Sequence, residues 1–316
     1  MEKKSLIKRI TSIREFGVLC ALVLLTVLLS VFADSFFSAS NFTTILRTIS
    51  TNGIIAVGMT FVVLTGGIDL SVGSVFALSG AFAAWTFNTM GSSLLGAVIC
   101  LVIGVLFGLF NGVMVSYLNV PAFIQTLVTM TAARGIVYIF CDGTPINNVG
   151  DFIGTLGRGR ILGFFPIPIL LMILVFLAGW FLLNRTTLGR YVYAIGGNEE
   201  CAKLSGVHVG KYKMIPYIIS GLTAAIAALI LCGRMNSAQP SMGEGFEMDA
   251  IAAAVVGGTS LSGGSGTIIG TLIGAMIIGV LMNGMNMLGL DSYAQYVVKG
   301  AVILLAVLIE NRRSRK

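Results

Sequence analysis

One aspartate, Asp69, stands out in this sequence because it lies in a glycine-rich break between two apolar runs, residues 66–74. Paired glycines beside serine and aspartate interrupt a helix and leave backbone polar groups unpaired. Within a membrane such groups are tolerated only when they are buried in protein or line a wet cavity. A carboxylate at that depth is costly and requires a partner. The sequence offers Arg134 and Lys299 as partners and does not choose between them.

The same pattern recurs near the other end of the chain. Residues 257–265 match residues 66–74 at six of nine positions, and each copy follows one apolar run and precedes another. Paired interrupted segments in the two halves of a membrane protein indicate a translocation site. An alternative is that both copies are ordinary cytoplasmic turns that resemble each other because both are rich in small residues. The candidate pathway or broken-helix residues are Gly66, Gly67, Asp69, Ser71, Asp249, Gly257 and Gly258.

The motifs of catalysis and of ATP hydrolysis are absent from the sequence. It contains no phosphate-binding loop of the GxxxxGK[ST] type, no HExxH and no GxSxG. The single histidine, His208, excludes a histidine-rich metal site, and the five cysteines form no CxxC pair. Asp69 and Asp249 could share a proton as a carboxylate dyad, but nothing else supports catalysis. We therefore expect a non-enzymatic chain with no catalytic residue, no metal site and no cofactor of its own.

Membrane-spanning helices are the elements that must position these residues. Hydrophobic residues make up 56% of the 316 residues and charged residues only 10%, whereas a soluble domain carries about a quarter charged residues. The prediction is an all-α polytopic membrane protein of about ten transmembrane helices, some short or broken. Its first apolar run is longer than that of a signal peptide, so we expect an uncleaved span. The predicted spans are 16–33, 48–65, 72–88, 93–115, 121–140, 166–183, 214–233, 248–258, 267–289 and 293–309.

Basic residues predict the orientation of these spans. They cluster in residues 1–15, 184–213 and 311–316, which ten spans place on one side, and the positive-inside rule makes that side the cytoplasm. Both termini are then cytoplasmic tails that flank a single membrane domain, 16–310. The main external loop is 141–165. These clusters account for the excess of basic residues, so membrane lipid is expected as a partner and nucleic acid is not.

The predicted cytoplasmic loop contains the signals of a short helix. Asn198 is a suitable N-cap, and two glutamates follow it where the helix dipole favours acids. Glu199 and Lys203 are four residues apart, and Gly206 is a suitable stop. We expect a helix over residues 199–205. A helix this short is marginal alone, so either its own membrane domain or a separate cytoplasmic subunit holds it.

Several segments together resemble the permeases of bacterial monosaccharide importers of the ATP-binding-cassette (ABC) class. The resemblance runs in order from about residue 40 to 310. It implies a multi-pass permease subunit of the bacterial inner (cell) membrane that carries a monosaccharide, a ribose-like sugar above others. The segments that carry it are 52–60, 67–74, 188–199, 204–206, 237–240, 247–253 and 257–261.

The resemblance also implies partners. A second permease copy would complete a dimer, a cytoplasmic ATP-binding subunit would hold ATP and magnesium, and an extracytoplasmic sugar-binding protein would meet the loop 141–165. The loop 184–213 would couple the permease to the ATPase. Its candidate coupling residues are Gly197, Asn198, Glu199, Glu200, Ala202, Lys203, Leu204, Ser205 and Gly206.

A competing interpretation is a self-sufficient secondary transporter or channel for a small polar solute, driven by an ion gradient. Such a protein uses acids within the membrane as ion sites. Asp69 is the best candidate for that role in this sequence.

Overall fold

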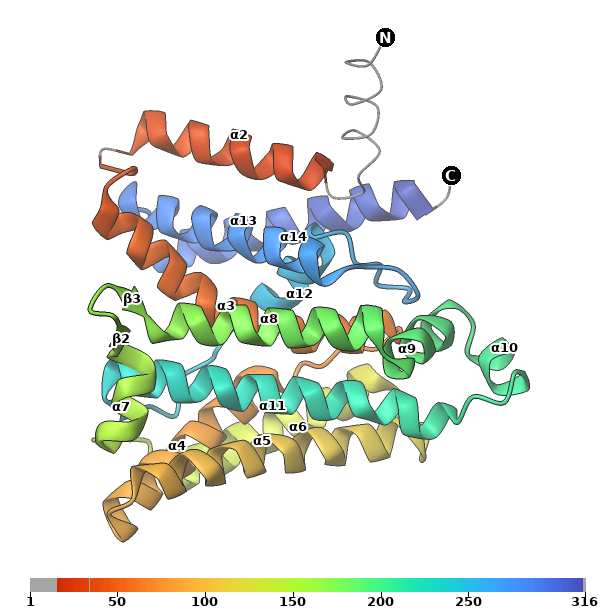
Figure 1. Cartoon of the computed structure of the whole chain (residues 1–316), viewed down its shortest axis with the longest axis horizontal. Helices are drawn as coiled ribbons and strands as arrows, with labels where there is room; N and C mark the ends of the chain where they lie inside the picture. Colours follow the sequence, from red (N-terminus) through yellow and green to blue (C-terminus); the bar gives the residue numbers. More distant parts are fainter. Residues whose placement is uncertain (1–15, 34, 315–316) are drawn as a thin grey trace.

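The computed structural model describes residues 16–33 and 35–314, with side chains described as far as Leu308. Helices dominate it, and most of them run along one axis (Figure 1). The predicted N-terminal tail, 1–15, and the last two residues lie outside the described part. The elements, in chain order, are α2 Phe16–Phe32, α3 Ala39–Leu64, α4 Val72–Met90, α5 Ser93–Ser116, α6 Ala122–Phe140, β1 Ile146–Asn147, α7 Gly150–Arg158, β2 Arg160–Ile161, β3 Phe165–Pro166, α8 Ile167–Arg185, α9 Thr187–Gly197, α10 Glu199–Leu204, α11 Val209–Met235, β4 Ser237–Ala238, α12 Phe246–Val256, α13 Ile268–Met287 and α14 Ser292–Ser314.

A helix lies over every one of the ten predicted spans. In the described part, six helices, α3, α5, α6, α8, α11 and α13, are long and apolar enough to cross a bilayer, while α2 and the described part of α14 are shorter apolar helices. The helix α12 has 11 residues, which cover about 16 Å of a hydrocarbon core about 30 Å thick. These findings confirm an all-α polytopic membrane protein with short helices among its elements.

Helix α3 begins nine residues before the predicted start of its span. Ser38 caps it by accepting a hydrogen bond from the Asn41 backbone N–H. The polar residues that follow do not break the helix, because Thr43 and Thr44 donate their hydroxyl hydrogens to carbonyl oxygens four residues earlier. The apolar pattern alone could not show this polar first turn.

The centre of the molecule is α3. Nearly every residue of its second half is buried, and α11, α13, α12 and α8 pack around it. A helix that is apolar on all sides is a core helix. The end of α3 therefore brings the first glycine-rich break, residues 66–74, into the interior of the bundle.

Helix α5 approaches α11 closely through glycines spaced four residues apart. A Cβ atom at Gly104 would collide with the carbonyl oxygen of Gly221, and one at Gly108 would collide with that of Tyr217. Backbone lies directly against backbone here, so the two helices have no room for a larger residue. The glycines of α13 contact α12 in the same way, since Gly274 lies against the Ala253 carbonyl.

Gly104→Ala is expected to destabilise the chain by about 1–3 kcal/mol, because the added methyl group has to push two helix backbones apart. Thermal unfolding of the detergent-solubilised protein measures this as a lower midpoint. The matched control is Gly135→Ala in α6, where no atom lies within 4 Å of the added Cβ. Equal midpoints for the two variants would contradict the close packing of α5 on α11.

The two ends of the bundle differ. One end carries α7 and the β2–β3 hairpin, and the opposite end carries α9 and α10 (Figure 1). At the first end β1 pairs with β4, which joins the loop 141–165 to the segment that follows α11. The predicted external loop and the predicted cytoplasmic loop thus lie at opposite ends.

Candidate functional site

The first glycine-rich break places Asp69 inside the protein, where it is 1% exposed. Its Oδ1 accepts hydrogen bonds from the Ser71 backbone N–H at 3.0 Å and from the Ser71 hydroxyl at 2.6 Å. Its Oδ2 accepts one from the Ser220 hydroxyl at 2.7 Å. Ser71 is also the residue that precedes α4. The carboxylate therefore lies at the positive end of a helix dipole.

The prediction that Arg134 or Lys299 is the partner of Asp69 is wrong. The Arg134 guanidinium donates to the carbonyl oxygens of Pro240 at 2.6 Å and Met242 at 2.9 Å. The Lys299 ammonium lies 2.8 Å from Oδ1 of Asp249. Hydroxyl groups, a backbone N–H and a helix N-terminus take the place of a cation at Asp69, since each can donate to or favour a buried anion.

A chain of buried polar side chains extends from Asp69 across α5 and α6. The Asn111 amide donates to the Ser71 hydroxyl oxygen at 2.9 Å. Asn111 Oδ1 in turn accepts from the Thr129 hydroxyl at 2.6 Å and from the Gln125 amide at 3.3 Å. Sequence reasoning missed Asn111 and Gln125. The available signal was an amide side chain inside each of two otherwise apolar segments.

Asp249 forms a second and separate polar centre in α12. Besides Lys299, its carboxylate accepts a hydrogen bond from the Asn52 amide at 3.3 Å. Both members of the ion pair are largely buried, with side chains 6% and 15% exposed. Asp69 and Asp249 share no hydrogen-bond partner within the described residues, so the dyad geometry is not formed.

The two sequence copies meet in the structure. The Gly264 N–H donates to the carbonyl oxygen of Leu64, the last residue of α3, at 2.9 Å. Gly263 lies against the backbone of Gly66, and both Gly263 and Gly264 lie against Gly196 near the end of α9. The glycine-rich breaks and Gly196 of the predicted coupling loop therefore form one backbone cluster.

The predicted short helix is confirmed as α10. Asn198 caps it, because its side-chain oxygen accepts a hydrogen bond from the Cys201 N–H at 2.9 Å. The helix ends at Leu204, and Gly206, two residues later, has a left-handed φ of 83°, which suits glycine. The N–H groups of Gly206 and Val207 satisfy the carbonyl oxygens of Lys203 and Ala202.

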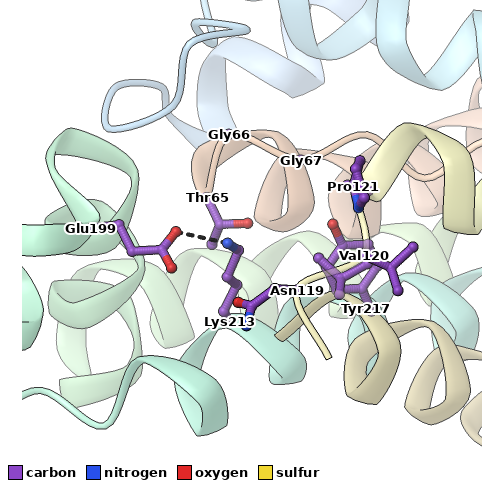
Figure 2. Close-up of a pocket in the computed structure, with 11 residues that line it drawn as sticks. Thr65, Gly66, Gly67, Asn119, Val120, Pro121, Glu199, Lys213 and Tyr217 are labelled. Atoms are coloured by element: carbon purple, nitrogen blue, oxygen red, sulfur yellow. Dashed lines mark hydrogen bonds and ion pairs between the residues drawn. The ribbon is translucent and has the colours of Figure 1, made fainter. Parts of the chain in front are cut away.

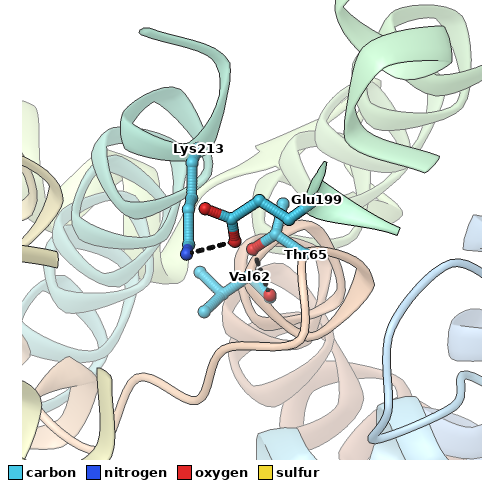
Figure 3. Close-up of polar contacts among 4 residues, drawn as sticks. All are labelled: Val62, Thr65, Glu199 and Lys213. Atoms are coloured by element: carbon cyan, nitrogen blue, oxygen red, sulfur yellow. Dashed lines mark hydrogen bonds and ion pairs between the residues drawn. The ribbon is translucent and has the colours of Figure 1, made fainter. Parts of the chain in front are cut away.

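An ion pair holds α10 to the bundle. Glu199 does not pair with Lys203, four residues away, but with Lys213 in the first turns of α11, at 2.7 Å (Figure 3). Thr65, which follows α3, lies beside this pair and donates its hydroxyl hydrogen to the Val62 carbonyl. Ala202 is buried, whereas Leu204 is 87% exposed. Helix α10 is thus held to α11 by the Glu199–Lys213 ion pair, while the side chain of Leu204 is exposed.

A pocket of about 260 Å³ lies between α10 and the first glycine-rich break. Its wall includes Gly66 and Gly67 together with Glu199, Lys213 and the buried Tyr217 (Figure 2). Its lining includes Glu199, a predicted coupling residue, as well as Gly66 and Gly67, two predicted pathway residues. Residues from both candidate sites of the sequence therefore meet at this pocket.

An apolar helical bundle with two interrupted segments packed together inside it is typical of a membrane transport protein. Residues 41–307 match the family described as branched-chain amino acid transport system / permease component. The chain belongs to this family of permease components and is a multi-pass protein of the inner membrane.

Similarity to individual permeases extends over almost the whole chain. It is 47% identical over 317 residues to the ribose import permease protein RbsC of Escherichia coli strain K12, covering 99% of this chain and 94% of that protein. The RbsC of Bacillus subtilis strain 168 is 46% identical over 303 residues (95% and 94%). The xylose transport system permease protein XylH of Escherichia coli strain K12 is 38% identical over 343 residues (89% and 87%). No solved structure matches the chain. These relatives confirm the predicted resemblance to monosaccharide permeases.

Proposed function

We propose that this chain is the membrane-spanning subunit of an ABC importer for a monosaccharide, with a ribose-like sugar as its substrate. The observation that carries the proposal is the similarity to ribose import permeases along nearly the full length. The chain forms the translocation pathway and a separate subunit hydrolyses ATP, with ATP and magnesium bound there. On this proposal the chain itself is not an ATPase.

Ten spans with both termini in the cytoplasm complete this arrangement, and a second copy forms a dimer with the first. The ends of the bundle support it, since α9 and α10 lie opposite α7 and the β2–β3 hairpin (Figure 1). The loop 141–165 then faces the outside and meets the sugar-binding protein.

Helix α10 is the element on which the ATP-binding subunit acts. The geometry that supports this role is an exposed Leu204 beside exposed charged residues, on a helix fixed at both ends by its caps. Gly196 contacts Gly263, which in turn contacts Gly66, so a movement of α9 is transmitted through backbone contacts to both interrupted segments. Those segments, with Asp69 and Asp249, line or brace the pathway.

Reconstitution of the chain with and without its ATPase and its sugar-binding protein tests the proposal. Uptake of labelled D-ribose into vesicles is expected only with all components and ATP, and it should survive collapse of the proton gradient. Uptake by the chain alone, without nucleotide, would contradict the proposal and favour the ion-driven secondary transporter.

The reactivity of two cysteines tests the orientation. Cys201 in α10 is exposed and should react with an impermeant maleimide in inside-out membranes but not in intact cells. Burial, together with the neighbouring Asp142 carboxylate, raises the pKa of the Cys141 thiol at the other end. The thiolate is the reactive form, so labelling of Cys141 from outside should be slow at pH 7 and should accelerate as the pH rises.

Variants with a single cysteine separate the two signals, and labelling is read by a mass shift on a gel. Labelling of Cys201 in intact cells would refute the proposed orientation. Labelling of Cys141 that is equally fast at pH 7 and at higher pH would contradict the raised pKa.

A further inference from the structure

The pocket between α10 and the first glycine-rich break contains a polar group that lacks a partner. Tyr217 is fully buried, and among the described residues its hydroxyl has no hydrogen-bond partner. The hydroxyl lies against Gly67, where a Cβ would collide with it, and both residues line the pocket. A buried hydroxyl without a partner is costly, so a ligand in the pocket that reached it would gain a hydrogen bond.

The charges of the pocket cancel. Its ionised side chains, Glu199 and Lys213, form an ion pair with each other and are 46% and 19% exposed. A net-neutral site has little preference for an anion or a cation, but the remaining lone pairs and protons of the pair can bind hydroxyl groups. The side chain of Asn119 adds an amide to the same wall (Figure 2).

The shape of the pocket restricts the size of its occupant. Its volume of about 260 Å³ lies just below the roughly 300–1,000 Å³ of sites for drug-sized ligands. Val120 and Pro121 provide apolar surface opposite the polar groups (Figure 2). One ring with hydroxyl groups on its edge and C–H groups on its face matches this combination.

We propose that this pocket is a cytoplasmic binding site for one small neutral polyhydroxylated molecule of the monosaccharide class. The inference rests on the proposed function, because the imported sugar is then the molecule that accumulates at this face. A bound sugar bridges Glu199 of α10 to Lys213 and Tyr217 of α11, and so restrains the coupling helix. Accumulated product thereby slows further import.

Equilibrium dialysis of the purified chain with radiolabelled D-ribose tests the binding site. Tyr217→Phe is expected to weaken binding about five- to tenfold through loss of one hydrogen bond. Without ligand its thermal midpoint should be equal or higher, because the unpartnered hydroxyl is gone. The matched control is Tyr138→Phe, the same change at an exposed position of α6, which should leave the affinity unchanged. D-Ribose 5-phosphate should bind more weakly than D-ribose.

Equal affinities of the wild type and Tyr217→Phe, or tighter binding of the phosphate ester, would overturn the proposal.

The complete transporter provides a second measurement in vesicles preloaded with unlabelled D-ribose or with sucrose. The ratio of uptake with internal ribose to uptake with internal sucrose should be below one, and should move towards one in Tyr217→Phe but not in Tyr138→Phe. An unchanged ratio in Tyr217→Phe would overturn the role of the pocket while uptake itself still supports the importer. Absence of uptake in the wild-type complex would instead overturn the proposed function, and the dialysis result would stand by itself.

Discussion

Glu199→Lys combined with Gly206→Pro is expected to reduce ATP-driven uptake by about tenfold or more, while the chain still inserts into the membrane. The first change places two cations where the Glu199–Lys213 pair now measures 2.7 Å. The second removes the N–H that donates to the Lys203 carbonyl and demands a negative φ where Gly206 has 83°. The first change therefore releases α10 from α11, and the second disrupts the C-terminal cap of α10.

Uptake and ATP hydrolysis are measured together on the reconstituted complex, and immunoblotting of membranes measures insertion. ATP hydrolysis should continue without sugar release. The control is the exchange Glu199→Lys with Lys213→Glu, which restores an ion pair of opposite polarity and should recover most of the uptake. Normal transport in the Glu199→Lys, Gly206→Pro variant would remove the coupling role of α10.

Replacement of Asp69 by alanine is expected to reduce uptake about as strongly as the Glu199→Lys, Gly206→Pro variant does, whereas replacement by asparagine should reduce it much less. Asp69→Ala leaves the buried hydroxyl groups of Ser71 and Ser220 without their acceptor, at a cost of about 1–3 kcal/mol for each. Uptake should be lost. Asp69→Asn keeps an acceptor oxygen for Ser71, and its amide can donate to the Ser220 hydroxyl, so it should retain much of the uptake.

This pair of variants also separates the two candidate functions. An ion-driven transporter with its ion site at Asp69 requires the negative charge, and Asp69→Asn would inactivate it as fully as Asp69→Ala. Uptake of D-ribose and the thermal midpoint are measured for both variants. Complete loss of uptake in Asp69→Asn, with the midpoint unchanged, would contradict a purely hydrogen-bonding role.

The helices and the end of α10 could be predicted because they depend on local signals. Apolar runs, the Asn198 cap and the glycine at 206 act within a few residues of each other. The four-residue spacing of glycines in α5 is likewise a local signal of close helix packing, but it does not indicate which helix approaches. These features require no knowledge of how distant segments pack.

Partners across the fold could not be predicted in this way. Ser220 is 151 residues from Asp69, and a serine in an apolar span looks the same whether it faces lipid or a carboxylate. The choice of a cation for Asp69 followed from charge alone, and it missed the donors that the start of α4 supplies. Lys213 was visible only as one basic residue of the cytoplasmic cluster, so its contact with Glu199 depends on how the loop folds back.

The cluster of Leu64, Gly196 and Gly264 makes contact through main-chain atoms, since a Cβ at Gly196 would collide with the Leu64 carbonyl. Side chains between moving parts can absorb a small displacement by changing rotamer, but peptide groups in direct contact cannot. A displacement of Gly196 would therefore be transmitted to Leu64 and Gly264 with almost no loss. Even the methyl group of Gly196→Ala would separate α9 from the end of α3.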